Sequence, residues 1–367
     1  MTLETMISNG LEDVVAAATR LSHVDGEAGE LIIAGYPVGE LAANATFEET
    51  TWLLWHGDRP SARELDAFRA DLAAQRALPA ATLALLRECA RARLDAMDAL
   101  RIALGTVSLV SQEPTAIVAL APTIVAAFHR LRAGEEPIAP RAGLGHAANY
   151  LYMLSGETPD AERVRALETY LNTVVDHGLN ASTFTCRVIT STGSDLVSAV
   201  VGAVGALKGP LHGGAPGPAL ETVFEIGDAS RAESVLRGKI AAGERLMGFG
   251  HRVYKVRDPR ADVLAAAAER LYTRAGDMRL YRLARDVEAT ALRLLEEYKP
   301  GRRLQTNVEF YTALVLHGLG LDVPLFTPTF AISRVSGWIA HALEQREANR
   351  LIRPRSEYIG PRDRRWR

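Results

Sequence analysis

Helical periodicity behind recognisable helix caps recurs along most of the 367-residue chain, and this feature constrains the fold most. Ser61 to Glu64 forms a capping box, and apolar residues follow it at helical spacing. Further helix starts are predicted at Thr158-Pro159, at the box Ser230 to Glu233 and at Asp258-Pro259. Strand signals are few, with Leu31–Ile33 as one short candidate, and strands do not alternate with helices. We therefore predict a mainly α architecture.

Two breaks divide this helical pattern. Glycines and prolines cluster from Gly209 to Pro218, and a second break runs from Asp322 to Pro328. Because the first cluster interrupts helices on both sides, it is expected to act as a hinge. We predict a large helical domain of residues 1–217 and 324–367, with a smaller helical domain of residues 218–323 inserted into it.

Composition favours a globular protein of the cytoplasm, without a nucleic-acid or membrane partner. The net charge of −2 gives no reason to expect a polyanion, and the arginine-rich end after Arg350 is interpreted as a solvated tail rather than an anion-binding surface. Cys89 and Cys186 are the only cysteines, which excludes a disulfide framework and fits a reducing compartment. Residues 1–15 lack the pattern of a signal peptide. The apolar run Leu196–Leu207 is too short to span a bilayer.

Four segments combine ionisable side chains with permissive backbone. They are residues 176–182, 208–215, 248–260 and 307–311. His212 and His251 each stand beside glycines, so that a ligand can approach the backbone closely. Arg260 falls in the first turn of a helix capped by Asp258, where free N–H groups already favour an anion. These residue types predict a site for a small acid.

Arginines strengthen this prediction. Arg334 lies in an apolar helical run and needs a charge partner there, and Arg353 adds another permanently charged group. Taken singly, His177 also fits a cation at a helix C-terminus, His212 and His251 fit loop histidines, and Glu309 fits a surface carboxylate. Four other histidines are assigned structural roles: His129, His146, His317 and His341.

A metal and a dinucleotide are both weak alternatives. The candidate histidines are widely separated, and neither an H-E-x-x-H motif nor paired cysteines are present, so no metal is expected. Gly248 to Gly250 is no dinucleotide fingerprint, because no strand precedes it and the third glycine is absent.

Together and in this order, the four segments resemble the signature of the citrate synthase family. The most specific stretches are Gly-Pro-Leu-His-Gly-Gly at 209–214 and Gly-Phe-Gly-His-Arg-Val-Tyr-Lys at 248–255. Further support comes from Asn-Val-Glu-Phe-Tyr at 307–311, Arg-Val-Ser-Gly-Trp at 334–338, Ser-His-Val-Asp-Gly at 22–26, Thr-Phe-Glu-Glu at 46–49 and Arg353-Pro354. The resemblance covers roughly residues 20–360.

The resemblance implies an acyltransferase that condenses acetyl-CoA with oxaloacetate and water to citrate and CoA, without a cofactor. Oxaloacetate would be bound by His177, His251, Arg260, Arg334 and Arg353. His251 would polarise the keto group, Glu309 would remove the methyl proton, and His212 would bond the thioester oxygen. The CoA-binding loop would be Leu246, Met247, Gly248, Phe249 and Gly250. Family members are dimers, in which Arg353 would enter the partner's site.

Two departures from the family pattern leave alternatives open. Glu309 stands where the family usually has aspartate, and Pro216 follows the His-Gly-Gly-Ala motif where asparagine is usual. One alternative is a 2-methylcitrate synthase that uses propionyl-CoA, since one methylene in an apolar pocket is worth only about 1–3 kcal/mol of discrimination. Another is a non-catalytic sensor of acyl-CoA or a dicarboxylate with the same fold.

Overall fold

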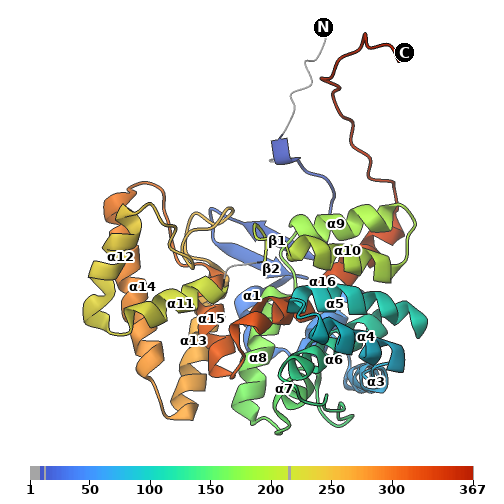
Figure 1. Ribbon diagram of the computed structural model, residues 1–367, viewed down its shortest axis with the longest axis horizontal. Helices are drawn as coiled ribbons and strands as arrows, with labels where there is room; N and C mark the ends of the chain where they lie inside the picture. Colours follow the sequence, from blue (N-terminus) through green and yellow to red (C-terminus); the bar gives the residue numbers. More distant parts are fainter. Residues whose placement is uncertain (1–8, 12–13, 214–215, 367) are drawn as a thin grey trace.

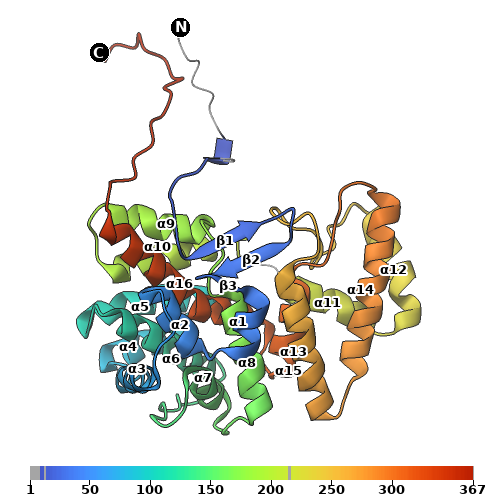
Figure 2. The same cartoon turned by 180° about the vertical axis from the view of Figure 1, so that it is seen from behind.

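The structure, a computed structural model, describes residues 9–11, 14–213 and 216–366 (Figures 1 and 2). Within these residues the chain forms sixteen α-helices and a single three-stranded antiparallel sheet in the order β1-β2-β3. The strands are β1 (Ser22–Asp25), β2 (Glu30–Ile33) and β3 (Tyr36–Pro37). The prediction of a mainly α architecture is therefore confirmed, and so is the short strand at Leu31–Ile33.

The helices gather in two groups. The first group is α1 (Val38–Asn44), α2 (Phe47–His56), α3 (Ala62–Ala74), α4 (Ala80–Arg91), α5 (Ala96–Leu104), α6 (Pro114–Arg132), α7 (His146–Ser155), α8 (Ala161–Val174), α9 (Ala181–Ser191), α10 (Leu196–Leu207) and α16 (Phe326–Glu347). The second is α11 (Pro216–Ile226), α12 (Ala232–Ala241), α13 (Pro259–Ala275), α14 (Arg279–Tyr298) and α15 (Val308–Gly318). Figures 1 and 2 show α11 to α15 together on one side of the molecule.

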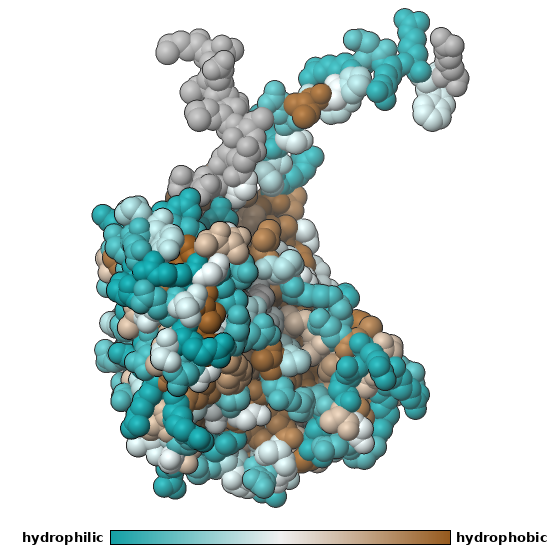
Figure 3. Space-filling model, turned by 60° about the vertical axis from the view of Figure 1, so that its left-hand side comes forward, coloured by the Kyte–Doolittle hydropathy of each residue, from teal (hydrophilic) through white to brown (hydrophobic). Residues whose placement is uncertain are grey.

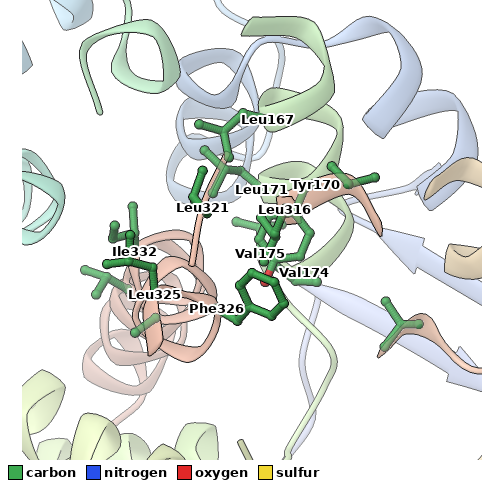
Figure 4. Packing of buried hydrophobic residues seen from close by; sticks show 14 of the residues in the cluster. Leu167, Tyr170, Leu171, Val174, Val175, Leu316, Leu321, Leu325, Phe326 and Ile332 are labelled. Atoms are coloured by element: carbon green, nitrogen blue, oxygen red, sulfur yellow. The ribbon is translucent and has the colours of Figure 1, made fainter. Parts of the chain in front are cut away.

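The two groups meet where α13 packs against α8 and α1. Figure 4 shows the neighbouring core, in which Leu171 of α8, Leu316 of α15 and Phe326 of α16 lie close to one another. A large helical part with a smaller helical part inserted after α10 matches the predicted architecture. The exact boundaries at 217/218 and 323/324 stay a prediction, and residues 214–215 of the expected hinge lie outside the described residues.

Among the described residues, one helix, α6, is long and apolar enough to cross a membrane by length and composition, and the bent pair of α15 with Val323–Glu347 passes the same test only when taken together. Residues 116–128 of α6 are all buried, and this helix packs against α4, α5, α7 and α16. This is the environment of a central core helix. The shorter run Leu196–Leu207 is α10, whose buried face includes Val200, Ala203 and Val204, in agreement with the expected core helix.

Two of the predicted helix starts are confirmed and two are corrected. Ser61 makes the full capping box of α3, and Asp258 caps α13. Helix α8 is capped by Asp160 rather than Thr158, because the chain stays extended through Asp160, whose carboxylate accepts the N–H of Arg163. The predicted capping box at Ser230 to Glu233 does not form. Asp228 accepts both the N–H and the hydroxyl of Ser230, and a short 3₁₀ turn, Ala229–Arg231, precedes α12.

The break predicted at Asp322 to Pro328 is shorter than expected. A 3₁₀ turn spans Val323–Leu325, and α16 begins directly afterwards at Phe326. Pro328 therefore lies in the first turn of α16, where its missing N–H has no partner to lose.

Close backbone packing joins α16 to the segment after α8. A Cβ atom at Gly337 of α16 would lie 2.1 Å from the carbonyl oxygen of Val175 and 3.3 Å from Oδ1 of Asp176. No side chain fits there unless the segment moves. His177 directly follows Asp176 in the sequence. This contact therefore fixes the distance between α16 and a predicted site residue.

We predict that Gly337→Ala destabilises the protein by about 1–3 kcal/mol, because the added methyl group must displace Val175. Urea denaturation measures the change. The matched control is Gly238→Ala, at an exposed position of α12 where a Cβ would meet no atom within 4 Å. There alanine removes the conformational cost of glycine and is expected to stabilise by about 0.5–1 kcal/mol. Equal stability changes in both variants would contradict the packing argument.

Candidate active site

Two loops from the two helix groups bring His177 and His251 together. His177 follows the end of α8, and His251 lies in the loop that precedes α13; their ring centroids are 5.7 Å apart. Tyr254 joins them, with its hydroxyl 3.1 Å from Nε2 of His177 and its ring 4.8 Å from that of His251. Burial and the charge of Arg260 hold the pKa of His177 well below its usual value.

The protonation of His251 follows from its neighbours. Its Nδ1 accepts the backbone N–H groups of Val253 and Tyr254, at 3.0 and 3.1 Å. Burial and the charge of Arg260 lower the pKa of His251 to about 4, so the ring is neutral at neutral pH and its proton lies on Nε2. This Nε2 is 3.4 Å from Nη2 of Arg260. The two groups can therefore donate to the same oxygen acceptor.

Arg260 is held in place by a buried ion pair with Asp258. The Asp258 carboxylate accepts from Nε and Nη2 of Arg260, at 3.0 and 2.8 Å. It also accepts the backbone N–H of Arg260 as the cap of α13, and the N–H of Val308 at the start of α15. One carboxylate thereby aligns the guanidinium and the N-termini of two helices.

The glycine-rich loop before His251 is fixed to the start of α15. Gly248 accepts the N–H of Asn307, and Gly250 accepts the side-chain amide of Asn307, at 3.0 and 2.8 Å. Both glycines have left-handed φ angles, of 89° and 80°, which other residues seldom adopt. Phe249 packs on Phe310 with 5.3 Å between ring centroids. The predicted CoA-binding loop of Leu246 to Gly250 is thus held next to the start of α15 through Gly248, Phe249 and Gly250.

Glu309 lies in the first turn of α15, half-buried. Burial raises its pKa to about 7, and the positive charges of Arg260 and Arg245 only partly oppose that rise. Asn307 caps the helix by accepting the N–H of Glu309. A carboxylate with such a pKa is suited to accept a proton at neutral pH.

His212 lies on the turn after α10, and its bonds are to Ser182 at the start of α9. Its Nε2 is 2.7 Å from the hydroxyl of Ser182 and 3.3 Å from the backbone N–H of the same residue. A backbone N–H can only donate, so Nε2 is an acceptor and the ring proton lies on Nδ1. Burial and the charge of Arg334 lower the pKa of His212 to about 4. His212 is therefore a neutral hydrogen-bond donor, oriented by Ser182.

Arg334 is buried on α16, next to the end of α8 that leads to His177. Its Nε donates to the carbonyl of Val174 at 2.7 Å, and its guanidinium lies 4.5 Å from the ring centroid of Phe330. Burial lowers its pKa to about 10, against the attraction of the Asp176 carboxylate. The carboxylate of Asp176 therefore provides part of the negative charge that the sequence predicted near Arg334.

Arg353 is not brought to these residues by its own chain. It is exposed in the C-terminal tail that follows α16, and Figure 3 shows this tail standing away from the body of the molecule. The other predicted residues lie on α16 or on the loops and helix ends described above. Among the residues that the structure describes, no group of three or more His, Cys, Asp or Glu side chains is arranged to hold a metal ion.

Tyr254, Ser182 and Asn307 lie within the predicted segments, but sequence reasoning assigned them no role. Asn307 carries a local signal, an N-cap residue before an apolar helix, and Tyr254 stands three residues after His251. Ser182 gave no such signal, because its partner His212 is 30 residues away along the chain.

Comparisons with known proteins agree with this geometry. The family model described as citrate synthase, C-terminal domain, matches residues 10–355. The citrate synthase of Haloferax volcanii is 41% identical, over 97% of each chain. The 2-methylcitrate synthase of Mycobacterium tuberculosis is 40% identical, over 96% of this chain and 91% of its own. The citrate synthase of Thermoplasma acidophilum, solved with carboxymethyl-coenzyme A and oxaloacetate, is 31% identical, covers 98% of each chain and superposes with a TM-score of 0.88.

We predict that Glu309→Gln stabilises the folded protein at pH 8 and has little effect at pH 4.5. The folded-state pKa of Glu309 lies above its unfolded value, so the carboxyl costs stability as the pH rises from about 4.5 to 7, and the cost stays constant above. Removal of the charge should gain on the order of 1–3 kcal/mol at pH 8. Denaturation of both proteins at the two pH values measures it. The control Glu296→Gln, at an exposed position of α14, should leave the free energy of unfolding unchanged at both pH values. If Glu309→Gln did not increase the free energy of unfolding at pH 8, the argument from the buried charge would be wrong.

Proposed function

The chain belongs to the citrate synthase family, and we propose that it condenses acetyl-CoA with oxaloacetate and water to give citrate and CoA. The observation that carries the proposal is the convergence of His177, His251 and Arg260 beside Glu309, a carboxylate with a pKa of about 7. A related structure holds oxaloacetate and a CoA analogue together. The same two ligands are proposed for this chain.

Oxaloacetate, a dianion with a keto group, suits the donors of this site. Arg260 and Arg334 are buried and positively charged, which favours the carboxylates. Nε2–H of His251 and the guanidinium of Arg260 are placed to donate to one oxygen, and the keto oxygen is the proposed acceptor. This polarisation makes the keto carbon electrophilic, and it stabilises the alkoxide that forms on attack.

The carbon nucleophile comes from acetyl-CoA. Glu309 removes a proton from the methyl group, and the electrons of that C–H bond form the C=C bond of an enol(ate) while negative charge develops on the thioester oxygen. His212 donates its Nδ1–H to that oxygen as a neutral imidazole, so the charge is stabilised as it develops. The enol(ate) carbon attacks the keto carbon, and the alkoxide that forms takes up one proton, equivalent to the one that Glu309 removed, to give citryl-CoA. Water then cleaves the thioester and releases CoA.

The loop of Leu246 to Gly250 is proposed to hold CoA through its backbone. The loop borders Glu309, because Asn307 bonds both Gly248 and Gly250, so a thioester bound there would lie near the base. No cofactor enters the scheme, since acetyl-CoA is itself a substrate. The two cysteines are buried and free, and we propose the cytoplasm as the location.

A homodimer is proposed for the active form. Arg353 is exposed and directly follows Ile352, whose N–H donates to the hydroxyl of Ser191 at 3.0 Å, and the tail continues from there away from the body (Figure 3). A second subunit bound at this end of the molecule would receive the tail, and Arg353 would add a further positive charge for oxaloacetate.

We predict that the purified protein releases CoA from acetyl-CoA only when oxaloacetate is present. A thiol-reactive dye follows the release, with propionyl-CoA assayed in parallel. Glu309→Gln should keep oxaloacetate binding and lose about 100- to 10,000-fold in turnover, because an amide cannot accept the methyl proton. No release with either thioester would favour the sensor, and a higher kcat/KM with propionyl-CoA would favour 2-methylcitrate synthesis.

We also predict that Arg353→Ala and His212→Ala subunits, each nearly inactive alone, regain activity when mixed. A mixed dimer would contain one site with both intact residues, so up to about a quarter of wild-type activity is expected for random mixing. Native mass spectrometry confirms that the subunits exchange. Heterodimers without activity would show that Arg353 does not complete the partner's site.

A further inference from the structure

One serine hydroxyl bonds both neighbours of His177. Ser22, the first residue of β1, donates to Oδ2 of Asp176 at 2.5 Å and accepts the backbone N–H of Gly178 at 2.9 Å. These two bonds bracket His177 from a strand more than 150 residues away in the sequence. We propose that β1 is a positioning element for oxaloacetate, with Ser22 fixing the His177 loop and Gly26 fixing the His251 loop. The proposal rests on the proposed function of the site.

Asp176 is a firm anchor for the Ser22 bond. Its other oxygen is 3.1 Å from Nε2 of His341, and Nδ1 of His341 is 3.0 Å from Nη1 of Arg187. A guanidinium can only donate, so Nδ1 is the acceptor and Nε2–H donates to Asp176. Arg187 is held in turn by Glu344 at 2.6 Å. All these side chains are buried or nearly so.

The charge on Asp176 makes the anchor strong. Burial opposes that charge, yet the neighbouring His341, Arg334 and Ser22 hold the carboxyl pKa below its ordinary value. A hydrogen bond to an ionised group is about twice as strong as one between neutral groups. The hydroxyl of Ser22 is therefore fixed, and with it the N–H of Gly178 on the far side of His177.

Gly26, the residue that directly follows β1, contacts the loop of His251. The carbonyl of Gly26 accepts the N–H of Lys255 at 2.9 Å. A Cβ atom at Gly26 would lie 2.2 Å from the carbonyl oxygen of Val253, so this approach admits only glycine. Val253 is also the residue whose N–H donates to Nδ1 of His251. A shift of Val253 would therefore shift the catalytic imidazole.

Five consecutive residues, 22–26, thus contact both histidine loops, one from each helix group. Figure 2 shows β1 and β2 lying between α9 and α10 on one side and α13 and α14 on the other. The strand pairs with β2 from Ser22 to Asp25, which stiffens it. Since reacting groups displaced by about 1 Å can lose on the order of 100-fold in rate, a strand that sets the distance between the two imidazoles affects oxaloacetate directly.

Ser22→Ala tests the first end. Loss of a bond to a charged group, worth about 1.5–3 kcal/mol, should raise the oxaloacetate Kd and KM by about 10- to 100-fold. The KM for acetyl-CoA, whose loop Ser22 does not touch, should stay within about twofold. Ser22→Thr keeps a hydroxyl and should restore most of the loss. Calorimetry measures oxaloacetate binding directly, and steady-state kinetics gives the two KM values.

Ser230→Ala is the matched control, because Ser230 also donates to an aspartate at 2.5 Å but lies on the exposed turn before α12. It should leave the oxaloacetate KM unchanged. A folded Ser22→Ala with wild-type oxaloacetate Kd and KM would overturn the role of Ser22. Equal rises in the KM of both substrates would also overturn it, since they would mean general loosening.

Gly26→Ala tests the second end while every bond of Ser22 remains. It should raise the oxaloacetate KM and lower kcat by at least about tenfold, because Val253 must move. Gly143→Ala, in a loop where a Cβ would meet no atom within 4 Å, is the control and should change neither. Wild-type kinetics in Gly26→Ala would overturn the role of Gly26. Inactivity of the wild type itself would instead reject the proposed function, so the two failures are distinguishable.

Discussion

The buried ion pair between Asp258 and Arg260 organises the region around it. Both side chains are almost fully buried, and such a pair is stabilising only when its geometry is good and its remaining bonds are satisfied. Asp258 meets this condition, because it also accepts backbone N–H groups at the starts of α13 and α15. The pair therefore fixes two things together: the direction of the guanidinium, and the position of Glu309 one residue after the second N–H donor. The permanent positive charge of Arg260 also lowers the pKa of the neighbouring His251 imidazole.

That arrangement separates charge from hydrogen-bond donation. Arg260 and Arg334 carry the positive charge, while burial and these same arginines keep His212 and His251 neutral, each with a pKa of about 4. A neutral imidazole still donates through its single N–H, and its other nitrogen is held by protein donors in both cases. The site can thus stabilise developing oxyanions without handing over a proton, as an oxyanion hole does.

Much of this was predictable where the signal is local. Asp258-Pro259-Arg260 places a cap, a first-turn proline and an anion-binding arginine within three residues, and the structure confirms the helix start. Thr158 was a wrong cap, because Asp160 offers a charged acceptor two residues further on. The bonds of Ser22 were not predictable, since they join β1 to residues that only the folded chain brings near. Non-local contacts of single side chains leave no periodic pattern in a sequence.

Hydrogen bonds to backbone groups hold the start of α15, and this bears on the glutamate at position 309. Asn307 bonds the carbonyls or amides of Gly248, Gly250 and Glu309, so the first turn of α15 is fixed whatever acidic side chain it carries. A longer carboxylate changes its own reach and leaves the frame intact. At a helix N-terminus the free N–H groups favour its charge, while burial opposes it. Burial is the larger effect and leaves the pKa at about 7, where a general base is half ionised at neutral pH and yet basic enough to take a proton from carbon.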